Sequence, residues 1–251
     1  MEYITLYTMI FLFGITIGSF LNVCIYRIPK KEDIVLERSH CMSCGNVLKW
    51  YELIPVFSFL FLRGKCRNCG AKLSMQYPMI ELLNGILYLL VAAVKGFTIE
   101  SVLFCICTSV LIVIAVIDWR TYEIPFGCNV IIGILGMVRL VTDLSHWYEY
   151  VIGFCVVSGL FLLIYLITKG RGIGGGDIKL MAAAGLLLGW QKILLSLMIG
   201  SIAGSVIHLT LMKLKNKERV LAFGPYLALG IFIAMLYGNE LINWYLALFG
   251  L

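Results

Sequence analysis

Two acidic residues stand where an apolar segment of the sequence meets a polar one. Asp118 follows an apolar run over 101–117, and Asp177 follows a glycine-rich tract over 170–176. Two carboxylates a few ångströms apart tend to share one proton. The ionised carboxylate can act as general base on a water molecule, and the protonated one can donate to a peptide carbonyl. The pair is therefore a candidate site for acid–base catalysis of the kind that aspartic proteases use.

Structural roles for the same residues stay open, although ionisable groups in apolar segments are functional candidates by default. An aspartate before a new apolar run often caps a helix N-terminus, which fits Asp177. Asp118 could instead pair with Arg120 or Lys179. Glu81 fits a first-turn carboxylate stabilised by the helix dipole, and we expect it to be a structural anchor.

Four cysteines form a second group with chemical potential. Cys41 and Cys44 make one C-x-x-C pair and Cys66 and Cys69 make another, about twenty residues further on. This spacing is typical of a zinc ribbon, in which four thiolates hold one Zn²⁺ and leave no position for water. We therefore expect a structural zinc, with a redox pair or an empty site as the alternatives. The other cysteines lie in or beside apolar runs and are expected to pack as small hydrophobic residues: Cys24, Cys105, Cys107, Cys128 and Cys155.

The composition indicates a protein whose main solvent is a lipid bilayer. Of the 251 residues, 61% are hydrophobic and 14% are charged, whereas about a quarter of a soluble domain is charged. Backbone polar groups in hydrocarbon must pair internally, which leaves helices or closed barrels. Because the apolar runs lack the alternation of barrel strands, we predict an all-α polytopic membrane protein.

About eight apolar segments are candidates to cross the hydrocarbon core, which is roughly 30 Å thick. The first, 3–26, has no basic segment before it and is too long for a cleaved signal peptide. The segment at 178–190 is the shortest and is rich in glycine. The remaining expected spans are 78–95, 100–117, 124–140, 147–168, 193–212 and 221–239.

The distribution of positive charge predicts which face is cytoplasmic. With eight spans, the connections at 27–77, 118–123, 169–179 and 213–220 share one face and hold 17 of the 20 Lys and Arg residues. Basic connections stay inside the cell, so this face is predicted to be cytoplasmic and both termini external. Because the basic residues follow membrane sidedness, nucleic-acid binding is not expected.

Three parts of the chain follow from this pattern. Residues 1–26 form the first transmembrane helix, and 27–77 form a small cytoplasmic four-cysteine, zinc-ribbon-like loop domain. Residues 78–251 form a helical membrane bundle that carries both aspartates. Thiols stay reduced in the cytoplasm, so metal binding is favoured over disulfides in the loop.

Taken together in chain order, these residues resemble the bacterial type IV prepilin peptidases, a family of membrane aspartic proteases. The resemblance covers nearly the whole chain and includes the paired cysteines of the loop. The two aspartates match the catalytic positions of the family, Asp118 with Ile124-Pro125 after it and Asp177 within Gly174-Gly175-Gly176-Asp177-Ile178-Lys179-Leu180. The other matching motifs are Gly18-Ser19-Phe20-Leu21-Asn22-Val23, Tyr26-Arg27-Ile28-Pro29, Tyr77-Pro78 with Glu81, and Phe223-Gly224-Pro225-Tyr226. Phe126 departs from the Asn or Asp that many members of the family carry.

The resemblance implies that the protein removes the short basic leader of type IV prepilins or pseudopilins at the cytoplasmic side of the bacterial plasma membrane. In relatives with the large first loop, the same protein methylates the new N-terminus with S-adenosylmethionine. The residues that would bind this methyl donor, the oligomeric state and the system that supplies the substrate are not identified by the sequence.

Three alternatives remain at this stage. A peptidase without methylation is the first, although such relatives usually lack the cysteine loop. A transporter would use Asp118 and Asp177 to bind a cation, and would place them near the middle of the bilayer in broken helices. A non-catalytic scaffold would use the cysteine loop to dock a partner and would tolerate loss of both carboxylates.

Overall fold

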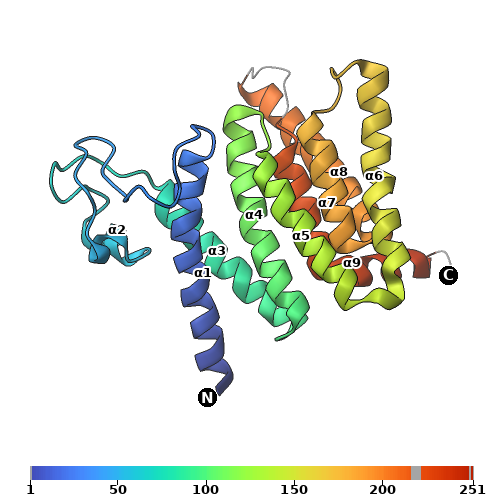
Figure 1. The fold of residues 1–251 in the computed structure, drawn as a ribbon, viewed down its shortest axis with the longest axis horizontal. Coiled ribbons are helices and arrows are strands. Elements are labelled where there is room, and N and C mark those ends of the chain that lie inside the picture. Colours follow the sequence, from blue (N-terminus) through green and yellow to red (C-terminus); the bar gives the residue numbers. More distant parts are fainter. Residues whose placement is uncertain (1, 216–221, 249, 251) are drawn as a thin grey trace. The chain divides into compact units, whose positions relative to one another are not determined.

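The computed structural model describes residues 2–215, 222–248 and 250, and its regular structure there is helical apart from two isolated antiparallel bridges (Figure 1). Two compact units divide the chain, Met1–Val113 and Ile114–Leu251. The all-helical architecture predicted from the composition is confirmed in these residues. The predicted functional division at residues 26 and 77 is a separate matter and stays a prediction.

The first unit is built on a close pair of helices, α1 (Glu2–Arg27) and α3 (Gln76–Lys95). Two glycines of α1 permit the approach, because a Cβ on Gly14 would lie 2.8 Å from the Cα of Gly85 and one on Gly18 would lie 2.7 Å from the Cα of Glu81. Small residues four positions apart are the usual means of bringing membrane helices together. The buried Asn84 side chain adds a hydrogen bond, donating to the Gly14 carbonyl at 2.7 Å.

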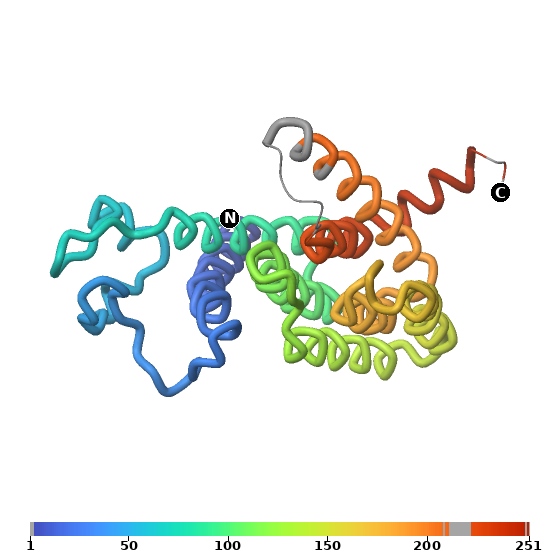
Figure 2. Tube along the Cα trace, turned by 90° about the horizontal axis from the view of Figure 1, so that it is seen from above, coloured from blue at the N-terminus to red at the C-terminus, as the bar shows by residue number. Residues whose placement is uncertain are grey.

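The segment between α1 and α3 is irregular and extends beyond the helix ends (Figure 2). Its regular structure is a short 3₁₀ turn, η1 (Trp50–Leu53), one short helix, α2 (Phe57–Phe61), and the two isolated bridges, His40–Val47 and Lys65–Lys72. The buried guanidinium of Arg27 holds its first part by donating to the carbonyls of Asp33 at 2.8 Å and Glu37 at 2.9 Å. A single side chain at the end of α1 thus organises a loop that has little regular structure of its own.

The second unit contains the end of α4 (Ile99–Thr121) and five further helices. The short helix α7 packs against α5, α6, α8 and α9, and half of its 14 residues are buried. Gly153 of α6 and Gly185 of α7 face each other's backbone, so neither position has room for a side chain. The bounds are α5 Phe126–Thr142, η2 Leu144–His146, α6 Trp147–Thr168, α7 Gly175–Leu188, α8 Trp190–Lys215 and α9 Gly224–Leu248.

Each of the eight expected spans coincides with a helix, but the helices differ in length. Within the described residues, α1, α3, α4, α6, α8 and α9 are long and apolar enough to cross a membrane. At 1.5 Å per residue, the 17 residues of α5 reach about 25 Å and the 14 residues of α7 about 21 Å. The shortness of α7 agrees with its position among other helices, where protein rather than lipid surrounds it. The basic connection expected at 213–220 lies outside the described residues from 216 onward.

Candidate active site and four-cysteine cluster

Asp118 lies one turn before the end of α4 and is 5% exposed. Its Oδ2 atom accepts a hydrogen bond from the backbone N–H of Gly224 at 2.8 Å, although 106 positions separate the two residues. Gly224 is the first residue of α9, so the carboxylate of Asp118 lies at a helix N-terminus. Free N–H groups and the helix dipole both stabilise negative charge there. A Cβ on Gly224 would lie 2.8 Å from the same oxygen, which explains the glycine.

Asp177 is the third residue of α7 and is partly buried. Its Oδ2 atom accepts the backbone N–H of Gly174, the residue before the helix, at 3.3 Å. The expected capping role is therefore present, but Asp177 reaches back from the first turn and Gly174 occupies the N-cap position. As with Asp118, a carboxylate meets the positive end of a helix.

The turn after α4 and the start of α7 are in contact. A Cβ on Gly176 would lie 3.0 Å from the Cβ of Ile124, so a side chain at position 176 would crowd Ile124. This contact places the residue just before Asp177 against the segment that follows Asp118. In Figure 1 the connection from α6 to α7 and the last turns of α4 lie at the same end of the second unit. The structure thus brings the two predicted site residues to one place.

The glycines before Asp177 contribute by close approach rather than by unusual backbone angles. Among Gly170 to Gly176 only Gly170, with φ of +78°, adopts the left-handed region. Beside them, the ammonium of Lys179 lies 5.1 Å from the centre of the Phe126 ring, where a cation–π attraction is expected. Phe126 therefore presents an aromatic face to Lys179.

The carboxylate positions disfavour the transporter alternative. Asp118 lies three residues before the end of α4 and Asp177 lies in the first turn of α7. A cation-coupled carrier would place them in interrupted helices near the bilayer centre. Two carboxylates at helix ends, each with one oxygen held by a backbone N–H, are instead suited to acid–base chemistry.

The four cysteines of the loop form one cluster in the first unit. Their Sγ atoms all lie within 4.8 Å of one another. Each pair sits in the same kind of turn: Gly45 N–H donates to the Cys41 carbonyl at 2.8 Å, and Gly70 N–H donates to the Cys66 carbonyl at 2.9 Å. Both glycines have positive φ, +68° and +71°, which a residue with a Cβ rarely adopts.

The thiol geometry fits a tetrahedral metal ion. Four sulfurs at about 2.3 Å from zinc lie about 3.8 Å from one another, and the Sγ atoms of Cys41 and Cys69 are 3.9 Å apart. The Asn68 amide lies 3.7 Å from the Cys44 sulfur as a hydrogen-bond donor, which stabilises a thiolate. Cys41 and Cys66 are buried, whereas Cys44 and Cys69 are exposed. The residues present could therefore hold a closed, structural zinc.

Glu81 is an anchor, as expected, but its location differs from the expectation. The helix α3 begins at Gln76 rather than at 78, which puts Glu81 in the second turn. Its Oε2 atom accepts the N–H of Val56 at 2.7 Å and so ties the loop to α3. Val56 has φ of +61°, a strained conformation for a β-branched residue that this contact helps to hold.

Two features of the second unit were missed by sequence reasoning. The Gly224 N–H is a backbone donor, and the glycine at this position does not by itself identify Asp118 as the acceptor. Asn129 of α5 is 5% exposed, and neither polar atom of its side chain has a hydrogen-bond partner within the described residues. It shares a helix face with Gly133 and Gly136, which pack on α7. A polar residue inside an apolar run was the signal that could have found it.

Known proteins resemble this chain over most of its length. The bacterial Peptidase A24 N-terminal domain matches residues 12–95, and the type IV leader peptidase family matches residues 105–209. A prepilin leader peptidase/N-methyltransferase of Bacillus subtilis (strain 168) is 34% identical over 95% of this chain and 97% of the relative. Proteins of the same name from Legionella pneumophila and Pseudomonas aeruginosa are 32% and 31% identical, over 96% and 95% of this chain and 94% and 93% of the relatives.

The chain belongs to the type IV leader peptidase family. As a member of this family, the chain is a peptidase. The name shared by its relatives, prepilin leader peptidase/N-methyltransferase, supports a methyltransferase activity as well. Together with the six long apolar helices, family membership also makes the chain a multi-pass inner-membrane protein. No solved structure matches the chain.

Replacing one pair of thiols tests the metal centre. A Cys41→Ser, Cys44→Ser variant should lose nearly all bound zinc, because two thiolates cannot close the coordination shell. The measurement is elemental analysis of the purified protein, with about one zinc per wild-type chain expected. Cys155→Ser, which changes an exposed cysteine of α6, is the matched control and should keep its zinc. Unchanged zinc in the double variant would rule out this site.

Proposed function

We propose that this protein cleaves the basic leader of type IV prepilins or pseudopilins at the cytoplasmic membrane boundary, with Asp118 and Asp177 as the catalytic pair. The observation that carries the proposal is that the turn after α4 contacts the start of α7, while Asp118 and Asp177 each accept a glycine N–H at a helix start. The relatives' name, prepilin leader peptidase, agrees with this substrate.

The proposed reaction uses water as the nucleophile. The two carboxylates share one proton, and the ionised one takes a proton from water as the water oxygen attacks the scissile carbonyl carbon. The protonated carboxylate gives its proton to the carbonyl oxygen. When the tetrahedral intermediate collapses, the C–N bond breaks and the amine nitrogen receives a proton from the pair. Neither aspartate forms a covalent bond to the substrate.

The hydrogen bonds of the site give each carboxylate a fixed direction. The Gly224 and Gly174 N–H groups each bind one oxygen, which restricts rotation of the carboxylates. The reacting groups are therefore held in place before the substrate arrives, which lowers the entropic cost of the reaction. A prepilin anchored in the bilayer by its own apolar helix would present its cleavage site at a fixed depth.

The orientation of the protein follows from its charge. Basic residues gather in the connections that precede α3, α5, α7 and α9, and the positive-inside rule assigns these connections to the cytoplasm. We place the cysteine loop and both aspartates on this side, and the termini on the other. The lipid bilayer is thus the main partner besides the substrate.

The loop 27–77 is proposed to support the second activity, methylation of the new N-terminus with S-adenosylmethionine as methyl donor. A zinc ion held by Cys41, Cys44, Cys66 and Cys69 would stabilise a segment with little secondary structure. The name shared by the relatives joins N-methyltransferase to peptidase, which favours both activities over the peptidase-only alternative.

Removing either carboxylate tests the catalytic pair. Asp118→Asn and Asp177→Asn should each lower the rate of prepilin cleavage by roughly 10²–10⁴-fold, the usual contribution of acid–base catalysis. The measurement is conversion of a purified prepilin by the purified enzyme in lipid. Asp143→Asn, in the α5–α6 connection, is the matched control and should cleave at the wild-type rate. Normal processing by either site variant would contradict the assignment and favour a scaffold role.

A pair of neighbouring glycines tests the contact that brings the two aspartates together. Gly176→Ala would push a methyl group against the Cβ of Ile124, so cleavage should fall about tenfold or more, as expected when a catalytic group is displaced. Gly175→Ala meets nothing within 4 Å and should stay within about twofold of wild type, since both changes alter helix propensity alike. Equal rates for the two variants would show that the contact does not position the site.

A further inference from the structure

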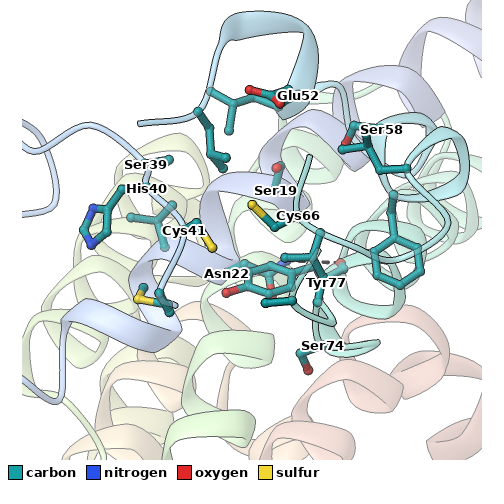
Figure 3. A pocket seen from close by; sticks show the side chains of 18 of the residues that line it. Ser19, Asn22, Ser39, His40, Cys41, Glu52, Ser58, Cys66, Ser74 and Tyr77 are labelled. Atoms are coloured by element: carbon teal, nitrogen blue, oxygen red, sulfur yellow. Dashed lines mark hydrogen bonds between the residues drawn. The ribbon is translucent and has the colours of Figure 1, made fainter. Parts of the chain in front are cut away.

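A cavity of about 350 Å³ lies in the first unit, between the end of α1, the start of α3 and the cysteine loop. Figure 3 shows Cys41 and Cys66, one from each C-x-x-C turn, at one wall, with Asn22 and Tyr77 close together at another. The Asn22 amide donates to the Tyr77 carbonyl at 3.2 Å, which joins α1 to α3 beneath the cavity. Cavities of this size accept small molecules of cofactor dimensions.

The lining of the cavity combines apolar rings with charges of both signs. Tyr26, Phe59 and Tyr77 contribute aromatic surface, and Glu52 contributes a carboxylate from η1. The positive charges of the lining come from Arg27, whose guanidinium is buried, and from Arg67 and Lys72. Such a mixture suits a ligand that carries a flat ring system and a zwitterion, because rings bind apolar surface while each charge finds its opposite.

Several contacts build the cavity rather than merely border it. Glu81, another lining residue, holds the strained Val56 of the loop at 2.7 Å, and Glu52 caps η1 by accepting the Lys49 N–H at 2.8 Å. The buried pair of cysteines forms part of the wall, so closing the metal cluster also fixes the shape of the cavity. Three separate interactions therefore maintain an open space in a loop that has little regular structure.

We propose that this cavity binds S-adenosylmethionine, the methyl donor of the N-methyltransferase activity proposed above, on which this inference rests. The aromatic and apolar lining would receive the adenine ring. The positive lining of Arg27, Arg67 and Lys72 would attract the ligand carboxylate, and Glu52 and Glu81 would attract its sulfonium and amino groups. A sulfonium is attracted by carboxylates and by aromatic faces alike. The cysteine loop thus acts as a wall of a ligand site as well as a metal site.

The transfer itself needs no further reactant. The α-ammonium group of the processed substrate first gives one proton to water. Its lone pair then forms a bond to the methyl carbon, while the C–S bond breaks and leaves its electrons on sulfur. The products are a methylated ammonium group and S-adenosylhomocysteine, whose sulfur is neutral. Because S-adenosylhomocysteine lacks this positive charge, the carboxylates of the cavity should bind it less tightly than they bind S-adenosylmethionine.

This preference provides the test. Binding of S-adenosylmethionine and of S-adenosylhomocysteine to the purified, zinc-loaded full chain in detergent is measured by titration calorimetry. Glu52→Gln keeps an oxygen that can accept the Lys49 N–H but removes the charge, so it should weaken S-adenosylmethionine about tenfold and S-adenosylhomocysteine less than about threefold. Glu37→Gln is the matched control, because its side chain lies on the same loop but outside the cavity lining.

The outcomes separate this inference from the proposed function. The expected result is a selective loss of donor affinity in Glu52→Gln and none in Glu37→Gln. Equal weakening of both ligands would mean a structural role for Glu52 and would overturn the charge-based assignment. If Glu52→Gln binds both ligands as the wild type does, and mass spectrometry shows that the wild type methylates a cleaved prepilin, the donor binds elsewhere. The proposed function would then stand without this inference. A wild type that neither binds nor methylates would overturn the methyltransferase proposal itself.

Discussion

Burying a carboxylate at the end of an apolar helix is costly unless a hydrogen bond compensates it, and this requirement governs the second unit. Asp118 is 5% exposed, and the N–H at the start of α9 supplies its partner across 106 positions of sequence. That bond fixes where α9 begins relative to α4. The starts of α9 and α7 therefore gather around the end of α4, and glycines occupy the places where a Cβ would obstruct them.

The same principle operates in the first unit with different groups. Arg27 and Glu81 are buried ionisable residues, and both bond to the backbone of the loop rather than to each other. Their bonds hold an irregular segment in place and leave a cavity between the loop and the helices. In both units, a charged side chain on a membrane helix organises backbone that would otherwise have no regular partner, and a candidate site results.

Much of the fold could be predicted because uninterrupted apolar runs in the sequence predict membrane helices. The expected span 147–168 coincides with α6, and the cysteine spacing predicted a cluster that the structure contains. The length of α7 was less predictable, since burial by neighbouring helices replaces the need to reach across the bilayer. The partners of Asp118 and Arg27 were beyond prediction, because backbone donors and acceptors are the same at every residue.

The central claim is that Asp118 and Asp177 act as one catalytic unit, and a double-mutant cycle tests it most directly. Cleavage of a purified prepilin is measured for each Asp→Asn variant and for the double variant under identical conditions. Groups that share one proton are strongly non-additive, so the double variant should be no more than about threefold slower than the slower single variant. A double variant whose loss equals the product of the two single losses would show independent roles and would contradict the account.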